Sequence, residues 1–374
     1  VLECKQRSLT YSASIKANLR LVVYDIDTEA NTKQILSTKE QEVFIGELPL
    51  MTKTGTFIVN GVERVVVNQM HRSPGVFFDH DKGKTHSSGK LLFNCRIIPG
   101  RGSWLDFEFD PKDILYFRID RKKKLPITTL LYALGISREQ VIENYYTQDQ
   151  FTYNKETNNW STKFIPENYK RPVKLPYDLI DAKTNKKFLD KSEKLNLVIA
   201  NKLKEKGLNS IIVSNNEIIG RYIAHDIKEK NGEYIIRSGF DITDELLQTI
   251  ISNEIYALKL VNIDPINKGP YLLETLKVEK NIDKTSALND IYRILRPGEP
   301  PTIEVAEQVF KNLYFNNERY DLSEVGRVKL NAKLNLTRSV KDTILYKEDI
   351  LAIIQLMIDL RDGKGDVDDI DHLG

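Results

Sequence analysis

The sequence has 374 residues, of which 41% are hydrophobic and 29% are charged, a balance typical of globular proteins with two or three domains. Its 55 basic and 53 acidic residues give a net charge of +2, so any site for a polyanion has to be a local patch. Cys4 and Cys95 are too few for a disulfide scaffold, and no apolar run approaches the ~20 residues of a membrane span. These features predict a cytoplasmic protein and exclude disulfide-rich secreted and membrane-spanning classes.

The first sixty residues have the pattern of an antiparallel β region. Residues 17–24 (ANLRLVVY) and 41–45 (QEVFI) are predicted strands separated by a polar stretch. Residues 52–56 (TKTGT) predict a turn that leads into an apolar strand at 57–59.

Residues 60–124 predict a β-sheet with charged loops. Short apolar runs at 65–67, 76–78, 91–93 and 97–98 indicate strands, and the alternation at 104–110 and 115–120 indicates strands with one wet face. The sheet is expected to be antiparallel, because the gaps between the runs are too short for helical crossovers.

The loops between these strands combine cations with an aromatic side chain. Lysines lie in residues 79–90 (DHDKGKTHSSGK), and Arg101 lies close to Trp104 in a glycine-containing loop. Single-stranded nucleic acid needs such groups, because lysine and arginine bind phosphates and bases stack on aromatic rings. A tryptophan in a strand more often belongs to the core, so both interpretations of Trp104 remain open. The run 121–124 (RKKK) likewise fits a solvated strand end or a phosphate contact.

A phosphate-binding loop is excluded by spacing. That motif needs four residues between its first glycine and a Gly-Lys-Ser/Thr triplet, but five residues separate Gly83 from Gly89, and Leu91 follows Lys90. The other frame, Gly83-Lys84-Thr85, would need a glycine where Phe78 stands.

Helices and strands alternate irregularly after residue 125. Helices are predicted at 126–134 and, from the capping box of Ser137 and Gln140, in the residues that follow. Residues 146–187 predict irregular strands and loops. Beyond them the patterns predict a helix at 195–207, strands at 210–213, 217–224, 232–237 and 256–261, and a helix that Thr243 caps.

Three more helices are expected near the C-terminus. They are predicted to begin at Thr285, at Thr302 with Val305 buried, and at Asp349. The fold class predicted from all these elements is α+β, with a β-rich first part followed by short helices packed on sheets.

No catalytic chemistry is visible in the sequence. The acidic tail at 366–371 lacks the spacing and closing glutamate of a calcium loop, and no serine elbow accompanies the five histidines. A paired-aspartate motif for two magnesium ions is absent as well. We therefore predict neither a metal site nor catalytic residues in this chain.

Several long strings resemble the β subunit of bacterial DNA-directed RNA polymerase. They occur in the family's order, at residues 46–51 (GELPLM), 61–113, 295–302 (LRPGEPPT), 319–331 (RYDLSEVGRVKLN) and 363–374 (GKGDVDDIDHLG). The resemblance implies part of a β-rich protrusion at 1–70, an α+β lobe at 71–364 with a variable β-rich module at about 147–262, and the return toward the protrusion at 365–374. It also implies that the family sequence continues beyond Gly374 and that 1–60 fold poorly alone.

The same resemblance implies a role in transcription. The lobe would form one wall of the DNA cleft and contact the non-template strand and downstream duplex, within a nucleotidyltransferase assembled with β′, α and initiation-factor subunits. The catalytic Mg²⁺ would be bound by β′, so this chain would need no cofactor of its own and would be inactive alone.

Site residues follow from the resemblance position by position. Trp104 would stack on an unpaired base, while Arg72 and Asp371, with Ile370 at the wall, would hold a flipped guanine. Backbone contacts are expected from Lys84, Lys90 and Arg101, and Asp120 lies beside the same loops. Val67 and Gln69 match the edge of the rifamycin pocket.

A competing hypothesis is a β-rich module that docks other subunits and never contacts nucleic acid. The two differ in salt dependence, because binding through phosphates weakens steeply as salt rises.

Overall fold

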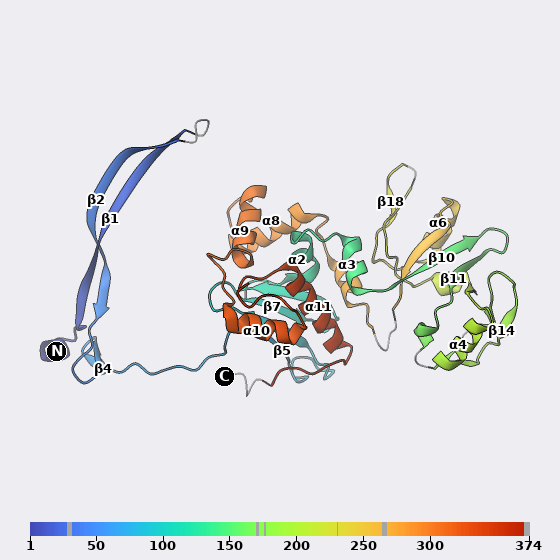
Figure 1. The fold of residues 1–374 in the computed structure, drawn as a ribbon, viewed down its shortest axis with the longest axis horizontal. Coiled ribbons are helices and arrows are strands. Elements are labelled where there is room, and N and C mark those ends of the chain that lie inside the picture. Colours follow the sequence, from blue (N-terminus) through green and yellow to red (C-terminus); the bar gives the residue numbers. More distant parts are fainter. Residues whose placement is uncertain (28–31, 170–171, 176, 230, 264–267, 370–374) are drawn as a thin grey trace. The chain divides into compact units, whose positions relative to one another are not determined.

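The structure is a computed structural model that describes residues 1–374 except 28–31, 170–171, 176, 230, 264–267 and 370–374. It divides into two units, Val1–His71 and Arg72–Gly374, which are considered separately (Figure 1). Helices and antiparallel sheets occur together, so the α+β prediction is confirmed.

The first unit is dominated by a long two-stranded ribbon. After the short helix α1 (Leu2–Gln6), strand β1 (Ser12–Asp27) pairs antiparallel with β2 (Thr32–Pro49), which confirms both predicted strands. Alternation places Leu19 and Leu21 on one face, where they are 52% and 62% exposed, and ion pairs such as Lys16–Glu42 on the other. Both leucines are therefore exposed, and the polar residues Gln41 and Lys39 lie opposite them on the same face.

A tight hairpin follows the ribbon. Strands β3 (Phe57–Val59) and β4 (Val62–Arg64) are joined by Asn60 and Gly61, whose φ angles of 51° and 78° fit the two-residue turn that Asn-Gly favours. The predicted turn at 52–56 is also present, closed by the Thr52 N–H to Thr56 O bond of 2.8 Å. The predicted strand at 65–67 is wrong: these valines leave β4 as extended chain, because no described strand pairs with them.

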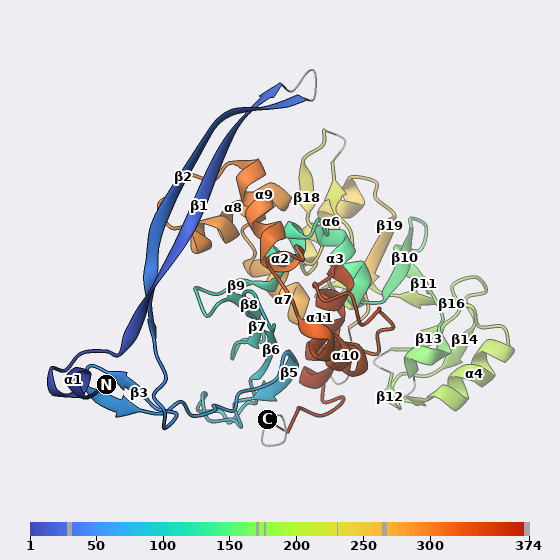
Figure 2. The ribbon, with the colours of Figure 1, turned by 60° about the vertical axis from the view of Figure 1, so that its left-hand side comes forward.

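The second unit is built on one five-stranded sheet. Its strands lie in the order β5 (Gly75–His80), β6 (Phe93–Ile98), β7 (Leu105–Phe109), β8 (Leu115–Ile119) and β9 (Leu125–Pro126), and every neighbouring pair is antiparallel (Figure 2). The antiparallel prediction is confirmed. The predicted strands at 91–93 and 97–98 are corrected to a single strand, because the backbone from Phe93 to Ile98 pairs continuously with β5.

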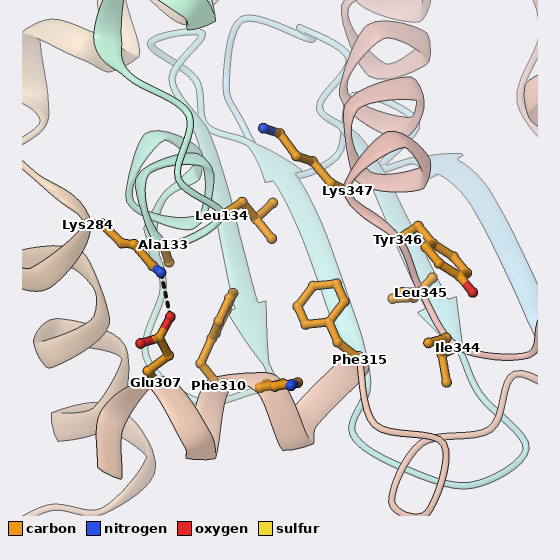
Figure 3. A pocket seen from close by; sticks show the side chains of 11 residues that line it. Ala133, Leu134, Lys284, Glu307, Phe310, Phe315, Ile344, Leu345, Tyr346 and Lys347 are labelled. Atoms are coloured by element: carbon orange, nitrogen blue, oxygen red, sulfur yellow. Dashed lines mark hydrogen bonds and ion pairs between the residues drawn. The ribbon is translucent and has the colours of Figure 1, made fainter. Parts of the chain in front are cut away.

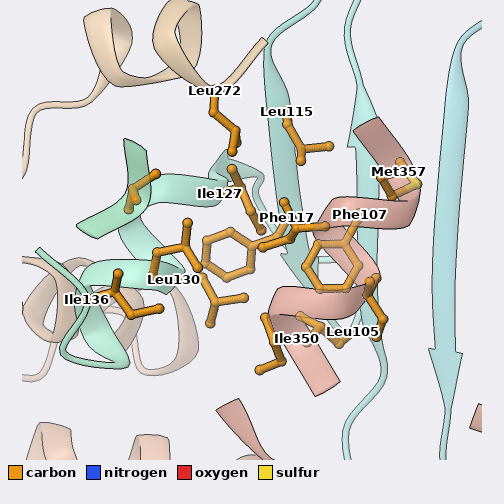
Figure 4. Close-up of a cluster of buried hydrophobic side chains, with 14 of the residues drawn as sticks. Leu105, Phe107, Leu115, Phe117, Ile127, Leu130, Ile136, Leu272, Ile350 and Met357 are labelled. Atoms are coloured by element: carbon orange, nitrogen blue, oxygen red, sulfur yellow. The ribbon is translucent and has the colours of Figure 1, made fainter. Parts of the chain in front are cut away.

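Helices from two distant parts of the sequence cover this sheet. They are α2 (Ile127–Ala133), α3 (Arg138–Tyr145), α7 (Tyr271–Val278), α8 (Lys284–Leu295), α9 (Ile303–Tyr314), α10 (Ser323–Leu334) and α11 (Lys347–Arg361). Helices α10 and α11 contact β5 and β6. The shared core includes Phe107, Phe117, Leu130, Ile350 and Met357, all fully or almost fully buried (Figure 4).

Local capping signals were good guides to these helices, with three corrections. The capping box of Ser137 and Gln140 is present. Helix α8 begins at Lys284 rather than near Thr285, because the Asp283 carboxylate accepts the Ser286 N–H at 2.8 Å. Val305 is 43% exposed instead of buried, and α11 begins at Lys347, so that Asp349 lies inside its first turn.

The middle of the chain forms a module with two small cores of its own. One core lies under the sheet β16-β11-β10-β19 and helix α6 (Asp244–Ser252), which Thr243 caps as predicted. Its strands are β10 (Gln148–Asn154), β11 (Asn159–Lys163), β16 (Ser210–Val213) and β19 (Ala257–Val261). The other core surrounds α4 (Leu197–Glu205). The predicted strand at 217–224 is wrong, because Ser214 and Glu217 form a capping box that starts helix α5 (Asn215–Ile218).

Short elements complete the module. They are the 3₁₀ helix η1 (Pro166–Tyr169) and the strand pairs β12 (Val173–Lys174) with β15 (Lys194–Leu195), β13 (Leu179–Ile180) with β14 (Lys187–Leu189), and β17 (Ile227–Lys228) with β18 (Tyr234–Ile236).

A buried arginine ties α10 to α11. Arg327 is fully buried and its guanidinium donates to the Asp349 carboxylate at 2.9 Å, to the Asp342 carbonyl at 2.6 Å and to the Ile344 carbonyl. Burial raises the pKa of Asp349, and the Arg327 charge opposes that rise. Arg327 therefore holds the whole segment between the two helices.

Replacing Arg327 with alanine is expected to destabilise the second unit by about 3–5 kcal/mol, because Asp349 and two carbonyls would be left buried without their donor. The free energy of unfolding is measured in urea by tryptophan fluorescence, with Trp160→Phe in every sample so that Trp104 alone reports. Arg293→Ala, which removes an exposed i,i+3 pair with Asp290, is the control and should change stability by less than about 0.5 kcal/mol. Equal effects of the two substitutions would refute the structural role of Arg327.

Amide hydrogen exchange should separate the ribbon from the sheet. Among the described residues before Arg72, Ile58 is the only buried hydrophobic one, whereas β7 and β8 lie in the large core. A two-stranded ribbon without a covered face is only marginally stable, so amides of β1 and β2 are expected to exchange orders of magnitude faster than those of β7. Equal protection in the 374-residue chain would contradict this expectation.

Candidate nucleic-acid interface

Trp104 lies at the start of β7 in a fixed backbone position. Its N–H donates to the Asp120 carboxylate at 2.7 Å, and its carbonyl accepts the Asp120 N–H at 3.1 Å and the Tyr314 hydroxyl at 3.4 Å. Asp120 thus bonds both backbone polar groups of Trp104. The contacts indicate that Asp120 positions the tryptophan.

The indole of Trp104 is partly exposed and has two guanidinium groups beside it. The guanidinium carbons of Arg96 and Arg121 lie 5.6 Å and 5.3 Å from the ring centre, within the range of cation–π attraction. Arg96 is also held by Asp106 at 2.5 Å. Among the described residues, no carboxylate forms an ion pair with Arg121, so its charge remains available to a ligand.

A strained turn directs Arg121 toward the ring. The Lys122 N–H donates to the Ile119 carbonyl at 2.9 Å, and the two central residues, Asp120 and Arg121, have φ angles of 48° and 59°. Aspartate tolerates this left-handed region better than most residues, but arginine enters it at a cost. The surroundings of Trp104 maintain this costly conformation.

Sequence reasoning did not single out Arg96, and it named Arg121 only as part of the run 121–124, a solvated strand end or a phosphate contact. The available signal for Arg121 was its place at the head of the run 121–124, directly after a strand. Two other members of that run are engaged within the chain: Lys122 donates to the Leu295 carbonyl at 3.1 Å, and Lys124 lies 3.7 Å from Glu108.

The loop of residues 79–92 is organised by one carboxylate. Asp81 accepts the N–H groups of Leu92, Gly83 and Thr85 at 2.9, 3.0 and 3.1 Å. These hydrogen bonds hold the pKa of Asp81 well below its usual range, and the bond from Leu92 has the largest effect. The exposed Lys84 lies on this loop, without an ion pair among the described residues.

Two other predicted phosphate contacts have partners inside the chain. Lys90 donates to the Asp113 carboxylate and the Pro111 carbonyl, each at 2.7 Å. The exposed Arg101 donates to the Asn317 carbonyl at 3.2 Å. Arg101 remains accessible, whereas Lys90 would have to leave an ion pair to bind a phosphate.

The predicted guanine pocket is described only in part. The Arg72 guanidinium lies 5.9 Å from the centre of the Phe77 ring. Ile370 and Asp371 lie outside the described residues, so their pairing with Arg72 stays a prediction. The preceding Asp368 binds the edge of the sheet, accepting the Phe78 N–H at 2.8 Å and the Lys333 ammonium at 2.6 Å.

Val67 and Gln69 lie in the first unit, in an exposed segment without regular structure. Val67 is 78% exposed. Their assignment to the edge of a drug pocket stays a prediction.

Within the described residues, no group of three histidine, cysteine, aspartate or glutamate side chains could hold a metal ion. No described helix has the length and apolar character needed to cross a membrane.

Comparison with known families matches the whole chain. The family description RNA polymerase beta subunit matches residues 2–259, and RNA polymerase Rpb2, domain 2, matches residues 244–374. The chain belongs to the RNA polymerase beta subunit family, as the sequence motifs predicted.

Individual relatives agree. Proteins named DNA-directed RNA polymerase subunit beta are similar over 100% of this chain: that of Jannaschia sp. (strain CCS1) is 51% identical over 387 residues, and that of Cereibacter sphaeroides (strain ATCC 17029 / ATH 2.4.9) is 49% identical over 384. The protein of Rhizobium leguminosarum bv. trifolii (strain WSM2304) is 50% identical over 375 residues. The chain spans 28% of the length of the first two relatives and 27% of the third.

Substituting Asp120 tests whether it positions the indole. Asp120→Ala removes the acceptor of the Trp104 N–H and puts a less tolerant residue at positive φ, so we expect a loss of about 1 kcal/mol and easier quenching of Trp104 fluorescence by acrylamide. Asp120→Asn keeps an acceptor oxygen and should behave nearly as the parent. Both are measured with Trp160→Phe, and unchanged quenching in Asp120→Ala would show that the carboxylate does not fix the ring.

Proposed function

We propose that this chain is the part of an RNA polymerase β subunit that forms a wall of the DNA cleft and binds the unpaired non-template strand through Trp104. RNA synthesis would occur only in the enzyme assembled with β′, α and an initiation factor, with Mg²⁺ held by β′. The described residues offer no cluster for that ion, so no step proposed here passes through a metal on this chain.

The partly exposed indole with an available cation beside it carries the proposal. A base from melted DNA can stack on the accessible part of the Trp104 ring, since every base has a π face. Arg121, 5.3 Å from the ring centre and free of ion pairs among the described residues, is close enough to attract the phosphate of the same nucleotide. Hydrogen bonds from Asp120 and Tyr314 hold the backbone of Trp104 in place as the base arrives.

Phosphates on either side of the stacked base would bind the other accessible cations. Lys84 and Arg101 are exposed. Arg72, with Ile370 and Asp371, would hold a flipped guanine, because a guanine edge offers acceptors to arginine and donors to aspartate. A base that is already unpaired costs little to turn outward.

Replacing Trp104 with alanine in the assembled polymerase is expected to shorten the lifetime of promoter complexes about five- to a hundredfold, the range for one lost stacked base. Extension of a primed template should stay unchanged, because the chemistry lies elsewhere. Trp160→Phe, a change to a fully buried tryptophan in the middle module, is the control and should alter neither measurement. Equal loss of both activities in Trp104→Ala would identify the ring as core.

Salt dependence separates this proposal from a docking module without DNA contact. Binding of single-stranded DNA to the 374-residue chain should weaken as salt rises, and Arg121→Ala or Lys84→Ala should each flatten the slope of log K against log salt by about 0.7. Lys206→Ala, an exposed lysine in the middle module, should leave the slope unchanged. Absence of DNA binding at any salt would favour the docking module.

A further inference from the structure

An open apolar cavity of about 390 Å³ lies on the second unit, and none of the residues assigned to DNA is among those that line it (Figure 3). Its floor consists of Leu345, which is fully buried, Phe310, which is 6% exposed, and the partly buried Phe315. Ala133 and Leu134 close one side at the end of α2. The volume falls within the usual range of sites that bind ligands or anchor side chains.

The floor is preformed by contacts beneath it. The Leu345 N–H donates to the Tyr314 carbonyl at 3.1 Å, and Arg327 holds the neighbouring Ile344 carbonyl. The rings of Phe310 and Phe315 pack 5.7 Å apart. An entering side chain would therefore displace water without ordering the protein first, which lowers the entropic cost of binding.

Lysines surround this apolar floor. The lining includes Lys284, Lys311 and Lys347, against a single carboxylate, Glu307. Glu307 pairs with Lys284 at 2.5 Å, and the pKa of its carboxyl is lowered first by Lys284 and also by Lys311. Among the described residues, neither Lys311 nor Lys347 has an ion-pair partner, and Figure 3 shows Lys347 extending over the cavity from the start of α11. The rim therefore carries excess positive charge.

We propose that this cavity docks an acidic segment of a partner protein, which places one large apolar side chain, such as phenylalanine or leucine, on the floor formed by Phe310, Phe315 and Leu345. Aspartate or glutamate residues beside that anchor would pair with Lys311 and Lys347. An apolar anchor in a fixed pocket supplies most of the affinity of such contacts, while charges at the rim set partner choice and association rate. The proposal does not depend on the DNA contacts of Trp104.

Charge and shape together favour a peptide over the other anions. A nucleic acid could use the lysines and stack a base on a phenylalanine ring, but the aliphatic side chains of Leu134, Ile344 and Leu345 in the lining favour an apolar amino-acid side chain. The apolar floor and the lysine rim therefore need separate tests. One test removes the apolar anchor from the peptide, and the other removes its acidic charges.

The experiment measures fluorescence anisotropy of labelled twelve-residue peptides with the 374-residue chain. The first peptide has one phenylalanine and one leucine among glutamates and aspartates, the second has alanine at the two apolar positions, and the third has lysine at every acidic position. The first peptide should bind saturably, and the other two should bind about tenfold more weakly or not at all.

Variants locate the binding on the chain. The double substitution Lys311→Glu and Lys347→Glu should weaken binding of the first peptide about tenfold or more and should strengthen binding of the lysine peptide compared with the first. Phe315→Ala should weaken binding only of peptides that carry the apolar anchor. Lys204→Glu with Lys206→Glu, the same charge change on α4, is the matched control and should have no effect.

Three results would overturn the proposal. They are equal binding of the first two peptides, an equal effect of the control and rim variants, and complete competition by a single-stranded oligonucleotide of the same charge. Each would show that the surface attracts anions without using the apolar floor. Loss of promoter-complex lifetime in Trp104→Ala bears on none of them, so failure of either proposal leaves the other standing.

Discussion

The buried guanidinium of Arg327 supports both surfaces to which we assign binding. Arg327 donates to the Ile344 carbonyl, and the adjacent Leu345 N–H donates to the Tyr314 carbonyl. The Tyr314 hydroxyl in turn donates to the Trp104 carbonyl. The floor of the apolar cavity and the backbone of the partly exposed Trp104 are thus connected through Tyr314. Because a buried charge that loses its partners is costly, this arrangement has little freedom to relax. Both surfaces are consequently supported by the same buried hydrogen-bond network.

The indole also depends on strain that the rest of the sheet sustains. Asp120 and Arg121 both have positive φ angles, which residues other than glycine rarely adopt. The hydrogen bonds between Asp120 and Trp104 maintain this backbone conformation. In return, the guanidinium of Arg121 is held beside the ring instead of moving freely in water. Preorganisation of this kind saves the entropy that a long flexible side chain would otherwise lose on binding a nucleotide.

Local patterns predicted the elements whose cause is local. The strand at Leu105–Phe109 and the caps at Ser137 and Thr243 depend on residues within a few positions, and the structure has all three. The solvent-facing side predicted for that strand is wrong, because Asp106 is only 7% exposed and pairs with Arg96. The strand predicted at 65–67 failed because a β-branched run needs a partner strand, and the described chain provides none there. The DNA contact of Lys90 stays a prediction. Its ion pair with Asp113, which lies beyond two further strands, could not be predicted from any short stretch of sequence.

Although the net charge is near zero, the cationic side chains fall into two groups, those with ion-pair partners and those without. Arg96, Lys90 and Arg327 are paired with Asp106, Asp113 and Asp349 and hold the fold, whereas Arg121, Lys84, Lys311 and Lys347 have no such partner among the described residues. An unpaired exposed cation contributes little to stability, because water screens and solvates it. Beside an aromatic or apolar surface, such a cation can pair with a ligand that supplies the negative charge. We therefore propose that the described cations without ion pairs at Trp104 and at the apolar cavity, rather than the total charge, indicate where partners bind.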